Sequence, residues 1–145
     1  MKTRVYIVLL VILTFFSSCI KTVREDPADR FVGHYQYVDN YYVRWGGDSK
    51  SSSLSGSFSL TKISATEVQM SGPWTTLGVV SGNTVSFGAC PQTDSDGYIN
   101  YTFGVANLIG NQLTFSYVGV GSQRFTNGIS YPWESAGNVT ATKMN

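Results

Sequence analysis

Histidine is almost absent from this chain, which has a single one, His34, among its 145 residues. A Ser-His-Asp triad needs a histidine beside its nucleophile, and the nucleophile motif G-x-S-x-G does not occur in the sequence. On a strand, His34 also faces away from its alternating neighbours Tyr35 and Tyr37, and therefore towards solvent. We predict a surface histidine and a protein that is not an enzyme.

Cysteine is scarce as well. Cys19 ends an N-terminal apolar run, and Cys90 is the one other cysteine. If Cys19 serves in anchoring, Cys90 has no disulfide partner within the chain. A lone cysteine usually behaves as a small buried apolar residue, and we predict that role for Cys90.

An excess of basic residues is also missing. Residues 31–145 contain five Lys or Arg against six Asp or Glu, so five minus six gives a net charge of −1. Nucleic-acid-binding proteins neutralise phosphates with clustered basic side chains, and we therefore expect no nucleic-acid partner. Asp94-Ser95-Asp96-Gly97 is faintly similar to a calcium loop but lacks the further ligands and the final Glu of an EF-hand. We predict a turn there, with no metal and no cofactor.

No apolar run is long enough for a comfortable membrane span. Val5–Phe16 has 12 residues, whereas a spanning helix needs about 20. Lys2 and Arg4 precede this run, and Ser17 and Ser18 follow it, which is the order of a secretory signal. We predict a signal peptide over residues 1–18.

The end of this segment resembles the lipobox of bacterial lipoproteins. The residues are Phe16-Ser17-Ser18-Cys19, with Phe16 at the position where Leu is usual. The resemblance implies that Cys19 becomes the first residue of the mature protein and carries acyl chains such as palmitate in the outer membrane. Several acyl chains together bind a protein firmly to a bilayer, because each buried CH₂ adds about 0.8 kcal/mol to the free energy of membrane binding. The alternative is an ordinary signal cut near Ser18, with Cys19 a plain thiol.

The next segment is strongly polar. Six of the eleven residues in Ile20–Arg30 are charged, and the segment contains Pro27 and no apolar period, so it cannot bury a core. We expect a flexible, lipid-anchored tether over residues 19–30 and one domain over residues 31–145. The acidic residues after the cysteine leave two orientations open, facing the periplasm or the cell surface.

The predicted domain is poor in helix formers, and its apolar residues alternate with polar ones, which is typical of antiparallel sheets with one wet face. Gly82-Asn83 and Gly110-Asn111 suit two-residue hairpin turns. About eight strands in hairpin order predict an all-β, antiparallel up-and-down β-barrel, which has no exposed edges. A β-sandwich is the alternative. The predicted strands cover residues 31–45, 54–63, 66–71, 75–80, 83–88, 97–106, 112–119 and 136–143, with an optional ninth near 123–130.

The first of these strands opens with a motif that resembles the start of lipocalin-like (calycin) domains. Phe31-Val32-Gly33-His34-Tyr35 is similar to their Gly-x-Trp motif, with Tyr35 at the position of the Trp. The mature chain as a whole also resembles small secreted lipoproteins of the lipocalin-like type. The resemblance implies a small apolar-lined cavity that is open at one end, and it does not identify a ligand.

Aromatic residues share the apolar parity of several predicted strands, so closure of a barrel would point them inward. They would then either fill the interior or line a site for an amphipathic or ring-containing ligand. The candidates for lining such a site are Tyr35, Tyr37, Trp45, Tyr101, Phe103, Phe115 and Tyr117.

Two further stretches are predicted to be loops at the barrel ends. Residues 46–53 are rich in Gly and Ser, and residues 130–134 carry Tyr131 and Trp133 beside Pro132. Exposed aromatic side chains on loops are candidates for binding. The alternative is that Trp133 covers one end of the barrel.

These features favour two functions. The first is a membrane-anchored lipoprotein whose barrel binds a small apolar or amphipathic ligand without catalysis. The second is an accessory module that binds a protein or a glycan through the two predicted loops. The anchor and the inward aromatic parity favour the first function.

Overall fold

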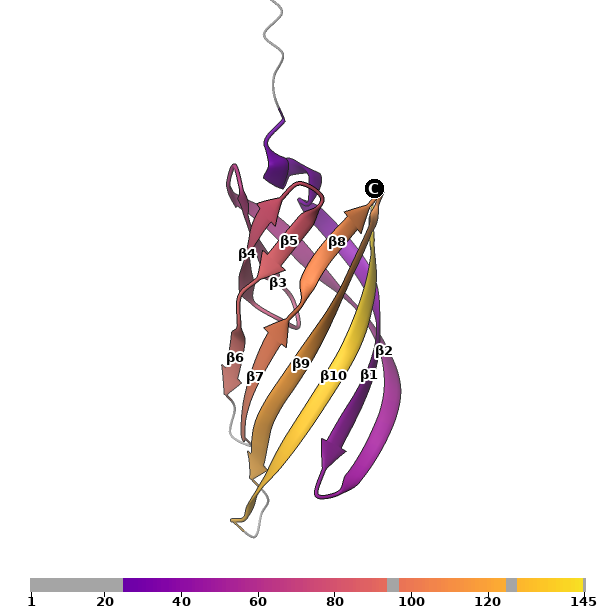
Figure 1. Ribbon diagram of the computed structural model, residues 1–145, viewed down its shortest axis with the longest axis vertical. Helices are drawn as coiled ribbons and strands as arrows, with labels where there is room; N and C mark the ends of the chain where they lie inside the picture. Colours follow the sequence, from indigo (N-terminus) through magenta and orange to yellow (C-terminus); the bar gives the residue numbers. More distant parts are fainter. Residues whose placement is uncertain (1–24, 94–96, 125–127, 145) are drawn as a thin grey trace, which may run out of the picture.

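The computed structural model describes residues 25–93, 97–124 and 128–144. Its strands form one antiparallel sheet, in which the order β10-β1-β2-β3-β4-β5-β8-β9 and an additional β10–β9 pairing close a ring of eight strands (Figure 1). The predicted up-and-down β-barrel is confirmed, and the two-sheet sandwich is excluded. The strands are β1 (Gly33–Trp45), β2 (Asp48–Ser64), β3 (Glu67–Ser71), β4 (Thr76–Ser81), β5 (Thr84–Phe87), β6 (Cys90–Thr93), β7 (Gly97–Phe103), β8 (Val105–Ile109), β9 (Gln112–Arg124) and β10 (Ser130–Lys143).

Ten strands make a ring of eight because two of the long strands are interrupted. β7 and β8 both pair with β9, and Gly104 between them donates its N–H to the Ser116 carbonyl at 2.8 Å. β5 pairs with β8, and β6, which follows β5 after two residues, pairs with β7. β6 and β7 therefore prolong the wall formed by β5 and β8 along the barrel axis, beside the second part of β9.

The ring is complete in only one half of the molecule. β3 pairs with residues 59–64 of β2, so within the described chain residues 48–58 of β2 pair with β1 alone. On the other side, β6 has β7 as its one neighbour among the described strands. We call this part the open half; it consists of residues 39–58, 90–93, 97–103, 117–124 and 130–139. The remainder, where the strands close the ring, is the closed half (Figure 1).

The ordered barrel begins earlier than predicted. Pro27–Arg30, placed by the sequence analysis in a flexible tether, form a short 3₁₀ helix, η1, on the closed half. Ala28 and Phe31 are fully buried there, and Lys62 contacts the carboxylates of Asp26 and Asp29 at 2.6 and 2.9 Å. Exposed ion pairs contribute under about 1 kcal/mol, so the two buried apolar side chains provide most of the attachment.

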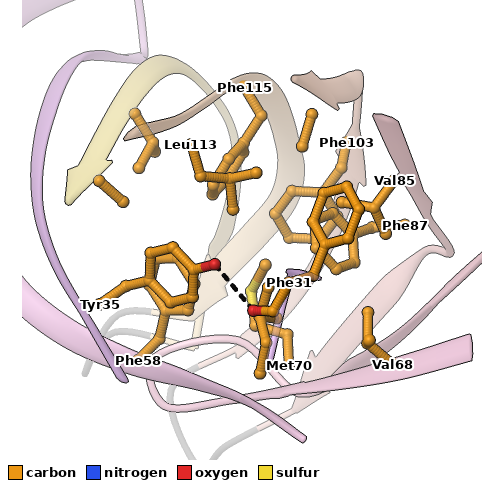
Figure 2. Packing of buried hydrophobic residues seen from close by; sticks show 14 of the residues in the cluster. Phe31, Tyr35, Phe58, Val68, Met70, Val85, Phe87, Phe103, Leu113 and Phe115 are labelled. Carbon is orange, nitrogen blue, oxygen red and sulfur yellow. Dashed lines mark hydrogen bonds between the residues drawn. The ribbon is translucent and has the colours of Figure 1, made fainter. Parts of the chain in front are cut away.

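Aromatic side chains fill the interior of the closed half and of its boundary with the open half. Tyr35 is fully buried, stacks on Phe58 with ring centroids 5.1 Å apart, and donates its hydroxyl hydrogen to the Phe31 carbonyl at 2.7 Å (Figure 2). This bond satisfies the one polar atom of the Tyr35 side chain in an apolar setting. Burial also raises the pKa of Tyr35 to about 12.

Trp74 lies at the centre of the aromatic core. It belongs to the connection between β3 and β4, directly after Pro73, and is 5% exposed. The sequence analysis did not select it, because a residue outside the alternating strands has no predicted inward parity. Its ring lies 5.4–6.5 Å, between centroids, from five other rings, which are those of Tyr37, Tyr101, Phe103, Phe115 and Tyr117.

Large rings fit in this narrow barrel partly because three of them lie across a glycine on the paired strand. Each glycine is the direct register partner of the tyrosine that covers it. A glycine without a Cβ lets a side chain approach the backbone closely. The pairs are Tyr37 over Gly56, Tyr101 over Gly119 and Tyr117 over Gly137, where an added Cβ would lie 2.5–2.9 Å from the tyrosine side chain.

The predicted loop over residues 46–53 is wrong. Gly46 and Gly47, with φ of 54° and 97°, make a two-residue turn, and the serine-rich stretch continues as β2 from Asp48. Positive φ at both central residues is the requirement of a type I′ hairpin, which two glycines meet without strain. The serines were mistaken for a flexible segment because they have no apolar alternation.

The predicted loop over residues 130–134 is also wrong, since these residues begin β10. Pro132 does not interrupt the ladder between β1 and β10, because it lies beyond their last pair, Trp45 with Trp133. At that point β10 has β9 as its one described neighbour, and a proline is tolerated on such an edge. No separate ninth strand lies near 123–130 in the described residues, because 123–124 end β9 and 130 begins β10.

Replacing Trp74 with Ala should lower the free energy of unfolding by about 3–5 kcal/mol, because it leaves a ring-sized cavity in the core. The matched change Trp45→Ala removes a side chain that is 43% exposed and should cost about 1 kcal/mol or less. Urea unfolding of the two variants measures the difference. Equal losses would contradict the central position of Trp74.

Candidate functional site

Two tryptophans lie beside each other on the inner face of the open half. Trp45 of β1 is the register partner of Trp133 of β10, which in turn pairs with Gly121 of β9. Trp45 is 43% exposed and Trp133 is partly buried. Side chains of directly paired residues have Cβ atoms about 4.5–5.5 Å apart, so the two indoles start from neighbouring positions on the inner face.

A pocket of about 210 Å³ adjoins this surface on the β1–β2 hairpin. Its walls share the inner parity of the two strands, since Tyr41 pairs with Ser52 and Val43 pairs with Lys50. An apolar cavity of about 150 Å³ holds a benzene molecule, so this pocket suits one ring-sized group. The lining residues are Tyr41, Val43, Trp45, Lys50 and Ser52.

A buried carboxylate lies two residues from Tyr41 on the same face. Asp39 is 3% exposed, and the Tyr117 hydroxyl donates to its Oδ2 at 2.6 Å. The other oxygen, Oδ1, has no hydrogen-bond partner among the described residues, and the same is true of the Ser135 hydroxyl, which is 4% exposed. Buried polar atoms are nearly always hydrogen-bonded, so these two atoms are candidates for binding a ligand.

The electrostatics of this region are set by burial. Burial raises the pKa of Asp39, and the hydrogen bond from Tyr117 partly opposes that increase. The pKa values of Tyr37, Tyr101 and Tyr117 are also raised, first by burial and then, among other causes, by the neighbouring carboxylate. The three hydroxyls therefore remain neutral, and Asp39 is the one of these four groups that gains or loses charge.

The structure divides the predicted ligand-lining residues into two groups. Tyr101 is partly exposed and Trp45 is exposed, and both lie in the open half. The other five pack in the core with 0–8% exposure, so they fill the interior, which was the competing interpretation. These five are Tyr35, Tyr37, Phe103, Phe115 and Tyr117.

The two residues predicted to bind from a loop are strand residues of β10. Trp133 has the inner parity of the open half, and Tyr131 shares that parity and is 42% exposed. The sequence analysis missed Asp39 as a site residue. A detectable signal existed, because Asp39 is the one charged residue among the alternating aromatic positions of β1.

The predicted positions of His34 and Cys90 are confirmed. His34 is exposed, with Nδ1 2.8 Å from the Ser59 hydroxyl, and Cys90 is 2% exposed. Residues 94–96, which hold most of the sequence that resembles a calcium loop, lie outside the described residues. In the part of the chain that the structure describes, no three His, Cys, Asp or Glu side chains cluster as metal ligands.

Two larger hollows lie on the outer face of the barrel. They measure about 630 and 660 Å³ and are lined mostly by outward-facing residues of β1, β2 and β10. The first contains Tyr42, Asn40 and Asn138, and the second contains Val38 and Thr140. Their walls combine apolar surface with hydroxyl and amide groups.

Neither the protein-family models nor the curated proteins with which the sequence was compared match this chain. The likeness to lipoproteins and to lipocalin-like domains therefore rests on the motifs in the sequence. Across residues 25–93, 97–124 and 128–144, no helix is long and apolar enough to cross a membrane.

Asp39 should make the stability depend on pH. Because its pKa is raised in the folded protein, the folded state binds more protons than the unfolded state between the unfolded pKa of about 3.9 and the folded value. Asp39 should therefore lower the free energy of unfolding as the pH rises through this window, after which its effect levels off.

Urea unfolding of the wild type and of Asp39→Asn at a series of pH values tests this dependence. The difference between the two profiles should change with pH across the window, because the variant lacks the titrating group. Asp48→Asn, at an exposed position of β2, serves as the control and should follow the wild type. Parallel profiles for the wild type and Asp39→Asn would contradict the assignment.

Proposed function

We propose that the protein is a lipid-anchored protein of the bacterial outer membrane that binds a small amphipathic ligand on the inner face of the open half, without catalysis. The observation that carries the proposal is the ring-sized pocket between Tyr41 and Trp45, beside which polar atoms of Asp39 and Ser135 have no hydrogen-bond partner among the described residues. A ligand there gains apolar contact with the rings and hydrogen bonds at the polar atoms.

The filled centre of the barrel supports this location. Trp74 and its neighbouring rings occupy the interior, so a ligand cannot lie at the centre of the barrel as it does in a hollow one. In the open half, by contrast, Trp45 and Tyr131 are 43% and 42% exposed on the inner face. Covering these rings removes apolar surface from water, which favours binding.

The position of η1 supports a particular orientation on the membrane. The described chain begins at Glu25 beside η1 on the closed half, at the end of the long axis opposite the β1–β2 turn (Figure 1). Cys19 is six residues before Glu25, a reach of at most about 20 Å of extended chain. If Cys19 carries the acyl chains, the closed half lies near the bilayer and the open half faces the aqueous phase.

A second candidate function is an accessory module that binds a protein or a glycan. The predicted binding loops proved to be strands, so this function would use the outer hollow of about 630 Å³ around Tyr42, Asn40 and Asn138. Tyr42 is 45% exposed there and could stack on a sugar ring or enter a partner's pocket. The unpartnered atoms of Asp39 and Ser135 lie on the other face of the wall and favour the first function.

Replacing Cys19 with Ala should remove the lipid anchor. The wild type should remain in the membrane fraction through a high-salt wash and dissolve in detergent, because several acyl chains bind a bilayer firmly. Cys19→Ala should move to the soluble fraction or persist as an uncleaved precursor of higher mass. Cys90→Ala serves as the control and should match the wild type. Identical fractionation and processing of the wild type and Cys19→Ala would refute the anchor.

Binding of 2-phenylethanol, a neutral amphipathic probe, should be saturable and should depend on the inner face. Trp45→Ala should weaken it by about tenfold, because the loss of a ring contact at the centre of a site costs more than about 1 kcal/mol. Tyr42→Ala, on the outer face, should leave it unchanged. Titration of the full chain in a non-ionic detergent, followed by saturation-transfer NMR, measures these affinities. Sensitivity to Tyr42→Ala alone would favour the second candidate, and no saturable binding would exclude the first.

A further inference from the structure

We propose that Asp39 receives the protonated amine of the ligand, so that the open half is specific for amphipathic ammonium compounds. This inference rests on the proposed function, since it specifies the head group of a ligand whose ring or apolar part occupies the pocket beside Tyr41. It follows from the carboxylate, from the side chains around it, and from the distribution of charge along the pocket.

The described residues provide no counterion for the carboxylate. Asp39 is 3% exposed, and the hydroxyl of Tyr117 occupies one of its oxygens. Among the described side chains no lysine, arginine or histidine nitrogen lies within 4.0 Å of Asp39, since the ion pairs of this part of the chain are those of Lys62. Burying a charge without a partner is costly, whereas an ammonium group would provide both a positive charge and a hydrogen-bond donor for Oδ1.

A second buried acceptor lies on the same face as the carboxylate. Oδ1 of Asp39 would be 2.5 Å from a Cβ added at Gly137, and the hydroxyl of Ser135 would be 2.6 Å from a Cβ added at Gly119. Ser135 and Gly137 are alternate residues of β10 and share the inner face, about 7 Å apart. Neither Oδ1 nor the Ser135 hydroxyl has a partner among the described residues, so a ligand head group with several donors, as an ammonium group has, meets two unsatisfied acceptors on this face.

Tyrosine rings surround this position. Tyr37 and Tyr41 flank Asp39 on β1, and Tyr101 and Tyr117 pack on each other from β7 and β9 with ring centroids 5.6 Å apart. The faces of aromatic rings attract cations, most strongly where water is excluded. The raised pKa values of Tyr37, Tyr101 and Tyr117 keep these rings neutral, so Asp39 supplies the negative charge.

The charges along the face orient the ligand. Lys50 lines the pocket on β2 opposite Val43, whereas Asp39 lies two residues from Tyr41 in the other direction. A cationic head group is repelled at the Lys50 end and attracted at the Asp39 end. Tyr41 and Asp39 are alternate residues about 7 Å apart, so a ring at the Tyr41 end of the pocket and an amine on a short linker span the two positions once the partly exposed Tyr41 ring moves aside.

Three probes with the same phenyl ring test the head group: phenethylamine, which is a cation at neutral pH, 2-phenylethanol, which is neutral, and phenylacetate, which is an anion. Calorimetric titration of the full chain in a non-ionic detergent should show phenethylamine binding at least about tenfold more tightly than 2-phenylethanol, because a hydrogen bond to a charged group is worth more than a neutral one. Phenylacetate should bind most weakly.

The variants separate a charge contact from a structural effect. Asp39→Asn should remove the preference, so that phenethylamine and 2-phenylethanol bind this variant with affinities within about twofold of each other, and Asp48→Asn, the exposed control, should keep the preference. Ser135→Ala should reduce the preference without removing it, and this variant decides the matter if Asp39→Asn does not fold. Circular dichroism before each titration checks folding.

Two results would overturn the inference. If the wild type binds phenethylamine and 2-phenylethanol equally, the site takes a small amphipathic ligand without recognising its charge, and the proposed function stands alone. If Asp39→Asn weakens all three probes by the same factor, Asp39 supports the fold and does not bind the amine. Failure of all three probes to bind would reject the proposed function itself.

Discussion

The structure depends on the packing of Trp74 against the rings of the inner wall. Trp74 enters the barrel from the connection between β3 and β4 and contacts rings from β1, β7 and β9 at centroid distances of 5.4–6.5 Å. An eight-stranded barrel has an interior just wide enough for side chains, so one large ring at the centre fills it. Large rings reach the centre because tyrosines lie across paired glycines, as Tyr117 does over Gly137.

This packing divides the barrel into two chemically different ends. In the closed half the chain continues into η1, whose buried Ala28 covers the core, and the buried hydroxyls of Tyr35 and Thr76 donate to backbone carbonyls. At the boundary with the open half the wall carries Asp39, linked to Tyr117 by a 2.6 Å hydrogen bond. A buried carboxylate destabilises a fold unless something compensates for its lost hydration. Because the Asp39 carboxylate lies beside a ring-lined pocket, a bound ligand could provide this compensation, and we therefore place ligand recognition at this boundary.

The all-β class, the antiparallel order and the Gly-Asn turns could be predicted, because strand alternation and turn chemistry are local properties of the sequence. The strand character of residues 48–53 could not, since it depends on pairing with β1 rather than on apolar alternation. The same holds for residues 130–134, where Pro132 is tolerated by an edge that exists only in the folded sheet. The inward parity of Tyr101 and Trp45 was predictable, whereas which inward rings would be packed and which exposed was decided by Trp74, a residue outside the strands.

The central claim is that one half of the barrel is packed and the other accessible, and the three tryptophans report on it directly. In the full chain labelled with 5-fluorotryptophan, fluorine NMR with a soluble paramagnetic agent measures the exposure of each indole. The account predicts strong broadening for Trp45, intermediate broadening for Trp133 and almost none for Trp74, in the order of their burial. Comparable broadening of Trp74 would show that the interior is open to solvent and would contradict the account.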